Sequence, residues 1–529
     1  MEYFIENIKI IDGTGSAPYY GSLGIQNGTI ILFPQSKNAE CIIDGTGYTV
    51  CPGFIDAHSH ADLCIGGDPM ITSLCKLSQG VTTEITGNCG FSIYPVLPEH
   101  LQDTKDVLGG FISERMKKKL PSFSTYENFI SYANFSKKAT NHIFLVGHSN
   151  LRAAVMGCSN RKPTKNELEQ MKKLLKDAME HGARGLSSGL VYIPGTYCDQ
   201  EELIELCKVI SPFSGICTTH MRNEADDVVA SVKDSIEIAK AANVSLVISH
   251  HKICGRQNTG LSKQTLQLIH DANEENIKVN LDVYPYHATQ TTLDNCLPPE
   301  YFSDGIDSLI EKIHTPSIRE EIITKMKQVP STYDNPYRNA GGFSGILISR
   351  AAKTKDAIGK TIVEYAKERN EDPFDTFFYL LVENHFEIYA TYFSLSEDEM
   401  LRIYQDPYSV VGSDALIGEI PAPTHPRAFG SFIKPLAEFA LKRNIISLED
   451  AISKQTSRTA KIYGLSNKGI IQNGYDADLV IFHESTLKAN ADFKDGTKLA
   501  SGIKMVFVNG TLSYQDMKMT GAFGGRCIL

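Results

Sequence analysis

The chain has 529 residues, of which 42% are hydrophobic and 22% charged, a balance typical of a folded globular protein. Its formal net charge of −10 argues against a nucleic-acid or anionic-membrane partner, because no excess of basic side chains exists to neutralise phosphates. We see no signal peptide at the N-terminus and no apolar run near the roughly eighteen residues of a membrane-spanning helix. The 12 cysteines are scattered, which suits reduced thiols, and we expect a cytoplasmic protein.

Both ends of the chain are rich in short β-strand patterns. Residues 3–11 and 29–33 read as strands, and Asn27-Gly28 before the second of these is a strong hairpin turn signal. Residues 477–482 and 503–508 read as strands near the C-terminus. Since chain ends often lie close together, we expect them to form one small β-sandwich domain.

The middle of the chain alternates between buried-type strands and amphipathic helical stretches, which predicts a parallel sheet. An open doubly wound sheet is the alternative, but no Gly-x-Gly-x-x-Gly follows a first strand. The number of strands favours a closed (β/α)₈ barrel of the triosephosphate-isomerase type. The eight predicted strands are 50–55, 80–87, 142–147, 183–187, 215–219, 244–249, 277–284 and 409–413.

The predicted barrel domain covers residues 51–462, and the predicted β-sandwich covers residues 1–50 together with 463–529. A long connection, 285–407, separates the last two barrel strands and contains several helical stretches. An insertion of this size at the loop face of a barrel is a natural lid or pocket wall. The predicted helices between strands are 165–180, 200–210, 225–242 and 262–275.

Residue types that bind metals collect where the predicted strands end. In a barrel of this kind, the chemistry sits at the C-terminal ends of the strands. Six of the 15 histidines fall at these few positions, together with a cysteine and an aspartate. The residues that follow the strands are His58, His60, Cys89, His148, His220, His250, His251 and Asp414.

Each of these residues has a plainer interpretation when it is taken alone. Cys89 could be one of many buried thiols, and Asp414 could cap a helix. His148 precedes Ser149 and could also cap the next helix, so we leave it out of the ligand set. His251 alternates away from His250 along the strand, and we expect it to be structural.

Nitrogen and sulfur ligands of this kind suit Zn²⁺, and three protein ligands leave a fourth position for water. A bound divalent ion lowers the pKa of such a water and polarises a carbonyl group. Asp414 is placed to accept the proton of that water and to return it to a leaving amine. The pattern therefore indicates a metal-assisted hydrolase.

Several longer motifs resemble the amidohydrolase superfamily, beginning with the run from Pro52 to His60 and ending with the run from Gly474 to Val480. The similarity narrows to the D-aminoacylase branch, the N-acyl-D-amino-acid deacylases, and it runs in order along nearly the whole chain. The motifs that carry it are Gly80 to Ser92, Val146 to Arg152, Gly185 to Gly195, Thr219 to Glu224, Ser249 to Lys252, Asp282 to Tyr286 and His425 to Arg427.

The resemblance implies a division of roles among the metal-type residues. Cys89, which takes the place of a bridging carboxylated lysine, would bind one zinc ion tightly with His220 and His250. His58, His60 and Asp414 would form a second, weaker site. Asp414 would also act as general base and then general acid.

The resemblance implies a substrate site as well. Lys252, Tyr284 and Arg427 match positions that hold the α-carboxylate of the substrate, a role for which the planar fork of arginine is suited. Tyr192 matches a tyrosine that polarises the scissile carbonyl. The activity implied is hydrolysis of the amide of an N-acyl-D-amino acid, with a small molecule as the partner.

Three departures from the branch pattern lie on the substrate side. The branch follows its last-strand aspartate with Gly-Leu-Pro-His, whereas this chain has Ala415-Leu-Ile-Gly. Gln290 stands where a carboxylate-binding serine is expected, and the connection from Asp414 to His425 is longer than expected. These departures leave open a cyclic amide or a short peptide that contains a D-amino acid. A non-catalytic scaffold is a further alternative.

Overall fold

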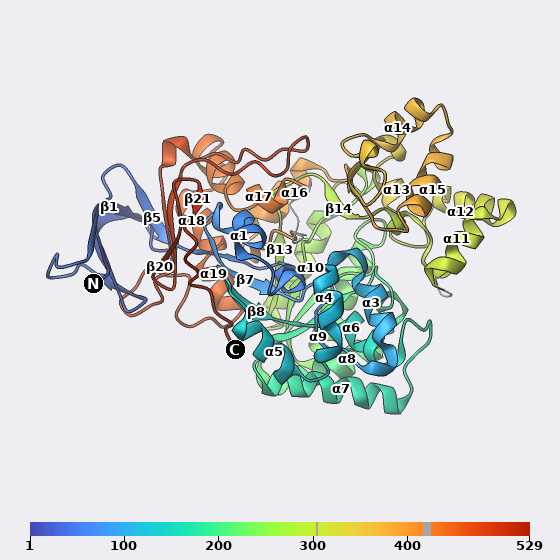
Figure 1. The fold of residues 1–529 in the computed structure, drawn as a ribbon, viewed down its shortest axis with the longest axis horizontal. Helices are drawn as coiled ribbons and strands as arrows, with labels where there is room; N and C mark the ends of the chain where they lie inside the picture. Colours follow the sequence, from blue (N-terminus) through green and yellow to red (C-terminus); the bar gives the residue numbers. More distant parts are fainter. Residues whose placement is uncertain (303–304, 416–424) are drawn as a thin grey trace.

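The computed structural model describes residues 1–302, 305–415 and 425–529. Strands from both chain ends form one sheet, at the left of Figure 1, with the order β21-β20-β19-β18-β5-β1-β2-β3 and with β4 paired to β1. Its nine strands are β1 (Tyr3–Ile10), β2 (Tyr19–Gln26), β3 (Thr29–Leu32), β4 (Cys41–Asp44), β5 (Thr49–Pro52), β18 (Leu479–Phe482), β19 (Ile503–Val508), β20 (Thr511–Gln515) and β21 (Lys518–Met519).

This sheet folds over itself and is the β-sandwich that both chain ends were expected to form. β18 pairs antiparallel with β5, and this pairing joins the two ends of the chain. Tyr3 of β1 and Phe507 of β19 are not on neighbouring strands, yet their ring centroids lie 4.9 Å apart. The predicted hairpin at Asn27-Gly28 is confirmed, since Gln26 and Thr29 pair across a two-residue turn with both central φ angles positive.

The predicted strand 50–55 is wrong in one respect, because it is two strands. β5 ends at Pro52 in the end sheet, and β6 (Phe54–Asp56) starts the barrel. Gly53 lies between them against Thr82, where a Cβ atom would sit 2.2 Å from the threonine hydroxyl oxygen. The chain therefore changes sheets at a residue without a side chain. The predicted domain division after residue 50 falls inside β5, and the remaining domain limits stay predictions.

The central part of the chain is a (β/α)₈ barrel of parallel strands. Sheet segments β6-β7-β8 and β9-β10-β11-β12-β13-β17 are joined through the chain at Leu145, where the predicted strand 142–147 is interrupted. The barrel closes where the Ala57 N–H donates to the Val411 carbonyl at 3.1 Å. The strands after β6 are β7 (Val81–Thr86), β8 (Asn141–Phe144), β9 (Val146–Gly147), β10 (Gly185–Gly189), β11 (Ile216–His220), β12 (Ser245–Ile248), β13 (Val279–Val283) and β17 (Ser409–Val411).

Amphipathic helices cover the outside of the barrel, as the sequence predicts. In α7, Met171, Leu175 and Ala178 are buried at the three- and four-residue spacing of one helix face. Thr164 and Glu167 form a capping box at its start. The helices between the strands are α5 (Tyr126–Phe135), α6 (His148–Met156), α7 (Lys165–Glu180), α8 (Gln200–Ile210), α9 (Val228–Ala242), α10 (Ser262–Glu274) and α16 (Glu397–Gln405).

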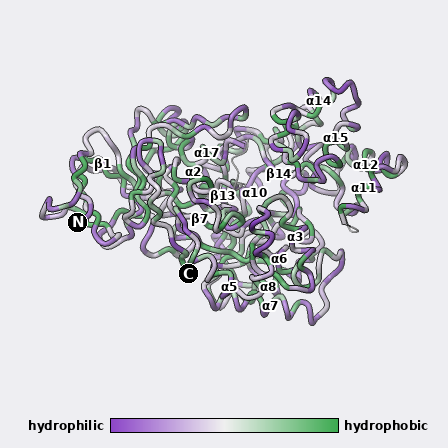
Figure 2. The backbone as a smooth tube through the Cα atoms, in the orientation of Figure 1, coloured by the Kyte–Doolittle hydropathy of each residue, from purple (hydrophilic) through white to green (hydrophobic). Residues whose placement is uncertain are grey.

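The long insertion has an antiparallel sheet and an apolar core of its own. The strands β14 (Thr289–Thr292), β15 (Ile346–Ala351) and β16 (Ile388–Tyr392) pair in the order β14-β16-β15. Its helices stand apart from the barrel at the upper right of Figure 1, and Figure 2 shows hydrophobic stretches within them. They are α11 (Ile306–His314), α12 (Pro316–Lys327), α13 (Pro336–Asn339), α14 (Ile362–Arg369) and α15 (Pro373–Glu383).

Shorter helices complete the barrel's two ends. In the described parts of the chain, no helix has both the length and the apolar character needed to cross a membrane. The twelve cysteines all lie in the described residues, and no disulfide joins them. The remaining α-helices are α1 (Pro69–Thr72), α2 (Leu74–Leu77), α3 (Leu101–Leu108), α4 (Glu114–Lys119), α17 (Arg427–Gly430), α18 (Leu448–Lys454) and α19 (Ser457–Ile462).

Candidate metal centre

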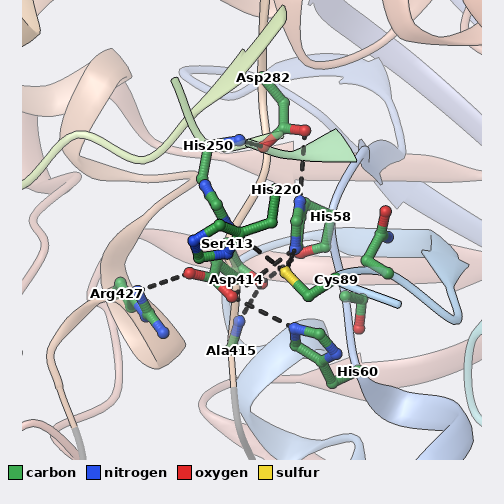
Figure 3. Close-up of polar contacts among 12 residues, drawn as sticks. His58, His60, Cys89, His220, His250, Asp282, Ser413, Asp414, Ala415 and Arg427 are labelled. Carbon is green, nitrogen blue, oxygen red and sulfur yellow. Dashed lines mark hydrogen bonds and ion pairs between the residues drawn. The ribbon is translucent and has the colours of Figure 1, made fainter. Parts of the chain in front are cut away.

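The metal-type residues named from the sequence meet at one rim of the barrel. His58 and His60 follow β6, Cys89 follows β7, and Asp414 follows β17. His220 is the last residue of β11, and His250 lies just after β12. Figure 3 shows their side chains gathered around the Cys89 sulfur. Parallel barrel strands end at the same rim, and this brings together residues far apart in sequence.

The Cys89 thiol is the centre of this group. Its Sγ lies 3.2 Å from His58 Nε2 and 3.3 Å from His250 Nε2. Burial alone raises the pKa of a thiol, but the neighbouring His58 and His250 lower the pKa of Cys89 well below its usual value. The sulfur is therefore favoured as a thiolate, the form that binds metals.

The backbone is held in an uncommon conformation at three of these positions. Cys89, His250 and Asp414 have φ angles of 53°, 36° and 49°. L-residues rarely occupy this left-handed region, and residues held there tend to occur at functional sites. The chain turns sharply just past each strand, and the side chain is aimed at the shared centre.

Asp414 joins the metal-type residues to the substrate side. Its Oδ1 lies 3.2 Å from His60 Nε2 and 3.6 Å from His58 Nε2. Its Oδ2 forms a 2.7 Å ion pair with Nη1 of Arg427. Burial alone raises the pKa of this carboxyl, but Arg427 and the surrounding histidines lower the pKa of Asp414 well below its usual value. The group is therefore ionised and able to accept a proton.

Glu224 connects the two histidines on β11 and β12 to Lys252. Its Oε1 lies 3.1 Å from Nδ1 of His250, and its Oε2 lies 3.6 Å from Nε2 of His220. Lys252 Nζ donates to both carboxylate oxygens, at 2.7 and 2.8 Å. Burial alone raises the pKa of Glu224, but Lys252 and the two histidines lower it.

Asp282 orients two of the metal-type residues, His58 and His250. Its Oδ2 lies 3.3 Å from Nδ1 of His58, and its Oδ1 accepts the backbone N–H of His250 at 2.8 Å. A carboxylate on the far nitrogen of a metal-type histidine fixes the ring and its tautomer.

A buried ion cluster ties the first and last barrel strands together. Lys76, on α2, pairs with Asp56 and lies 3.3 Å from Glu84, and its Nζ donates to Ser413 Oγ at 2.8 Å. Asp56 Oδ1 in turn accepts the backbone N–H groups of His58, at 3.1 Å, and of Ser413, at 2.8 Å. The cluster therefore holds the segment that carries His58 next to the segment that carries Asp414.

A cavity of about 1000 Å³ opens beside these residues. Tyr192, Lys252, Tyr284 and Arg427, which the sequence suggested for the substrate, all line it together with His220, His250 and Asp414. The Tyr284 ring contacts two cations, with Lys252 Nζ at 5.7 Å and the Arg427 guanidinium carbon at 4.9 Å from its centroid. Tyr284 Oη and Arg427 Nε have no hydrogen-bond partner among the described residues.

The structure also locates the departures from the family pattern. The Gln290 side chain donates to Ser349 Oγ at 3.0 Å, and its backbone carbonyl accepts from Arg427 at 3.3 Å. Gln290 therefore supports Arg427 through its main chain, while its amide is engaged by β15. Of the altered run after Asp414, Ala415 bridges to Ser59, and the following Leu-Ile-Gly, like most of the connection to His425, lies outside the described residues.

The two strand-end histidines set aside from the sequence have other partners. His148 Nε2 lies 2.8 Å from Glu202, which also pairs with Arg152. His251 Nε2 lies 2.9 Å from the hydroxyl of Thr265.

Glu224, Asp282 and Lys76 were given no role from the sequence. Glu224 and Asp282 lie within the family motifs Thr219 to Glu224 and Asp282 to Tyr286, and each is a charged residue near a predicted strand end. No local sequence pattern marks Lys76, because its partners come from other segments of the chain.

The donor set fits a divalent metal. Donor atoms of His58, Cys89, His250 and Asp414 lie within 4.8 Å of one another, and so do those of His220, Glu224 and His250. Thiolate sulfur, imidazole nitrogen and carboxylate oxygen are the ligands that zinc takes in proteins. The Cys89 sulfur lies within 3.3 Å of both His58 Nε2 and His250 Nε2, so the thiolate is next to both histidines.

The chain belongs to the amidohydrolase family, whose model matches residues 42–313 and 400–514. It is 33% identical to the D-aminoacylase of Alcaligenes xylosoxydans xylosoxydans over 98% of this chain and 96% of that protein. A solved D-aminoacylase structure, described with a binuclear metal centre, matches at a TM-score of 0.82 and 31% identity, over 99% of each chain. The N-acyl-D-glutamate deacylase of Bordetella bronchiseptica, solved with zinc and a phosphonate inhibitor, matches at a TM-score of 0.82 and 30% identity, over 100% of this chain and 98% of that one.

Replacing Lys76 with methionine will destabilise the protein by about 3–5 kcal/mol, because it leaves the buried carboxylates of Asp56 and Glu84 without their cation. Urea unfolding followed by circular dichroism measures this loss. Lys118→Met, at an exposed position, is the control and should change stability by less than about 0.5 kcal/mol. Equal stability of the two variants would contradict the role given to the cluster.

Proposed function

We propose that this protein is a zinc-dependent N-acyl-D-amino-acid deacylase. It hydrolyses the amide bond of the substrate and releases a carboxylic acid and a D-amino acid. One observation carries the proposal: Asp414 contacts the histidine cluster through one carboxylate oxygen and Arg427 through the other. A proton acceptor and a carboxylate-binding cation therefore lie side by side on one cavity.

We propose that Cys89, His220 and His250 hold one zinc ion tightly, and that His58, His60 and Asp414 contribute a second, weaker position. When bound, the zinc supplies Lewis acidity that polarises the scissile carbonyl and lowers the pKa of a water nucleophile. The Bordetella relative is described as bound to zinc and to a mimic of the tetrahedral intermediate, which supports both the metal and the hydrolytic reaction.

Asp414 is the group that moves the proton. Its Oδ1, on the histidine side, accepts a proton from the attacking water. The same carboxyl then donates this proton to the amine nitrogen as the C–N bond breaks. Arg427 and the histidines hold the pKa of Asp414 below its usual value, which keeps the carboxylate in its accepting form before the reaction.

The substrate is held at its α-carboxylate and at its carbonyl. Arg427 and Lys252 supply the cations, both near the Tyr284 ring, and the unpartnered hydroxyl of Tyr284 is a further donor. The hydroxyl of Tyr192 lies 3.4 Å from Thr291 Oγ1, and we propose that it donates to the carbonyl oxygen of the scissile amide. Both contacts fix the amide relative to Asp414.

The acyl-D-amino acid is favoured over a cyclic amide because two cations, Lys252 and Arg427, line the cavity, and a free carboxylate pairs with such groups better than a neutral ring does. The D-aminoacylase and N-acyl-D-glutamate deacylase among the relatives support the same class of substrate.

We expect N-acetyl-D-amino acids to be hydrolysed more than about tenfold faster than their L-enantiomers, because the loss of one substrate contact lowers the rate by about this factor. They should also be hydrolysed faster than a hydantoin. A panel of the three, followed by amine release, tests this; hydrolysis of the ring alone would overturn it.

Cys89→Ala will lose zinc and turnover together, because the sulfur is the central donor of the cluster. Metal content of the purified protein, measured by elemental analysis, is the primary readout, and activity the second. Cys207→Ala removes a buried thiol from α8 and should retain both. An active, zinc-free Cys89 variant would disprove the mechanism. If the unmodified protein binds zinc but hydrolyses no amide, a non-catalytic scaffold would be favoured instead.

Arg427→Gln will lower kcat/KM for an N-acetyl-D-amino acid by about 10- to 100-fold, the usual value of a charge-assisted hydrogen bond. The matched substrate is the corresponding N-acetyl-D-amino-acid amide, which has no carboxylate. It should be hydrolysed slowly, and the substitution should lower its rate much less, by only the part that Arg427 contributes through Asp414. An equal loss on both substrates would show that Arg427 acts on Asp414 rather than on the substrate carboxylate.

A further inference from the structure

Asp294 is an uncompensated carboxylate in the wall of the same cavity. It lies in the short 3₁₀ turn Leu293–Cys296, directly after β14 of the insertion. It lines the cavity that also holds Asp414, Arg427 and Lys252. Its Oδ1 is buried and has no hydrogen-bond partner among the described residues.

Two buried acids of the cavity wall have cationic partners. Glu224 pairs with Lys252, and Asp414 pairs with Arg427. Asp334 accepts the backbone N–H of Glu224 and the side-chain amide of Asn339, both at 2.7 Å. In the part of the chain that the structure describes, Asp294 has no cationic partner within ion-pair distance.

A buried carboxylate oxygen without a partner is costly, and such a group in a native structure calls for an explanation such as a catalytic role or a bound ion. Burial raises the pKa of Asp294, and only the hydroxyl of Thr292 and nearby backbone oppose this rise. A cation in the cavity would satisfy the free oxygen and offset that cost. Among the residues that the structure describes, Asp294 belongs to no group of three or more metal-type side chains, and this favours an organic cation over a metal ion.

The position of Asp294 relative to Arg427 fits one end of a small substrate. Arg427 donates to the carbonyl of Gln290, and Tyr192 contacts the hydroxyl of Thr291. Asp294 follows Gln290 by four residues, a span of at most roughly 14 Å in extended chain. Two to three residues of extended peptide cover about 7 to 11 Å. A ligand of that size, held by its carboxylate at Arg427, has a length comparable with this upper limit, and Arg427 and Asp294 line the same cavity.

We propose that Asp294 binds a positively charged group of the substrate at the end remote from its α-carboxylate. The preferred substrates are therefore acyl-D-amino acids that carry an ammonium or guanidinium group. That group belongs either to a basic D-side chain or to the acyl part, as in an aminoacyl-D-amino acid. This inference rests on the proposed deacylase function and deepens it.

Two matched substrate pairs test the inference on the zinc-loaded, full-length protein. N-acetyl-D-lysine against N-acetyl-D-norleucine compares a cationic with a neutral side chain. 6-Aminohexanoyl-D-alanine against hexanoyl-D-alanine makes the same comparison in the acyl group. We expect kcat/KM to favour the cationic member of one pair by about tenfold or more, as for a charge-assisted hydrogen bond. The pair that shows the preference identifies which end of the substrate reaches Asp294.

Variants at Asp294 then assign the preference to this side chain. Asp294→Asn should abolish the cationic preference while the neutral substrates are hydrolysed as before. Asp294→Lys should reverse it, so that a substrate with a negatively charged group at the same end becomes favoured. The control is Asp106→Asn, which removes an exposed carboxylate from the cavity mouth and should leave the preference intact.

The outcomes separate the inference from the proposed function. Hydrolysis of the neutral substrates with no cationic preference in either pair overturns the inference and leaves the deacylase proposal standing. A preference that survives in Asp294→Asn also overturns it. Failure to hydrolyse any of the four substrates overturns the deacylase proposal and the inference with it.

Discussion

Compensation of buried charge is the constraint on which this structure depends. The rim of the barrel holds several ionisable groups out of water, where an unpaired charge costs several kcal/mol. Each main acid therefore has its own cation: Asp56 has Lys76, Glu224 has Lys252, and Asp414 has Arg427. These ion pairs neutralise the buried acids and hold the strand ends in position. The thiol and imidazole groups at the same rim therefore face one another.

The geometry of the centre comes from backbone turns as much as from side chains. Cys89, His250 and Asp414 all adopt the left-handed region immediately after their strands. Asp282 stabilises that arrangement, because its carboxylate accepts the backbone N–H of His250 and contacts Nδ1 of His58. A donor set held in this way before any ligand arrives loses little conformational entropy on binding.

The barrel and its insertion divide the work of the site between them. The metal-type residues belong to the barrel strands, whereas β14 of the insertion carries Gln290 and Thr291 and leads to Asp294. Its backbone supports Arg427, and a hydroxyl of Thr291 meets Tyr192. Changes in the insertion can therefore alter which substrate is accepted while the reacting groups stay in place.

The sequence by itself determined the barrel, the β-sandwich of joined ends and the convergence of strand-end residues. Hydrophobic periodicity and turn signals are local, and parallel strands end at one rim whatever their length. Its family motifs also led to the amidohydrolase assignment, which the comparisons established.

Only the tertiary structure decided the rest. It divided the predicted strand 50–55 at Gly53, where Thr82 of another segment approaches too closely for a side chain. It paired Lys76 with Asp56, turned the Gln290 side chain toward Ser349, and left Asp294 without a cation. Charge pairing and side-chain direction depend on neighbours far away in sequence, and no local pattern encodes them.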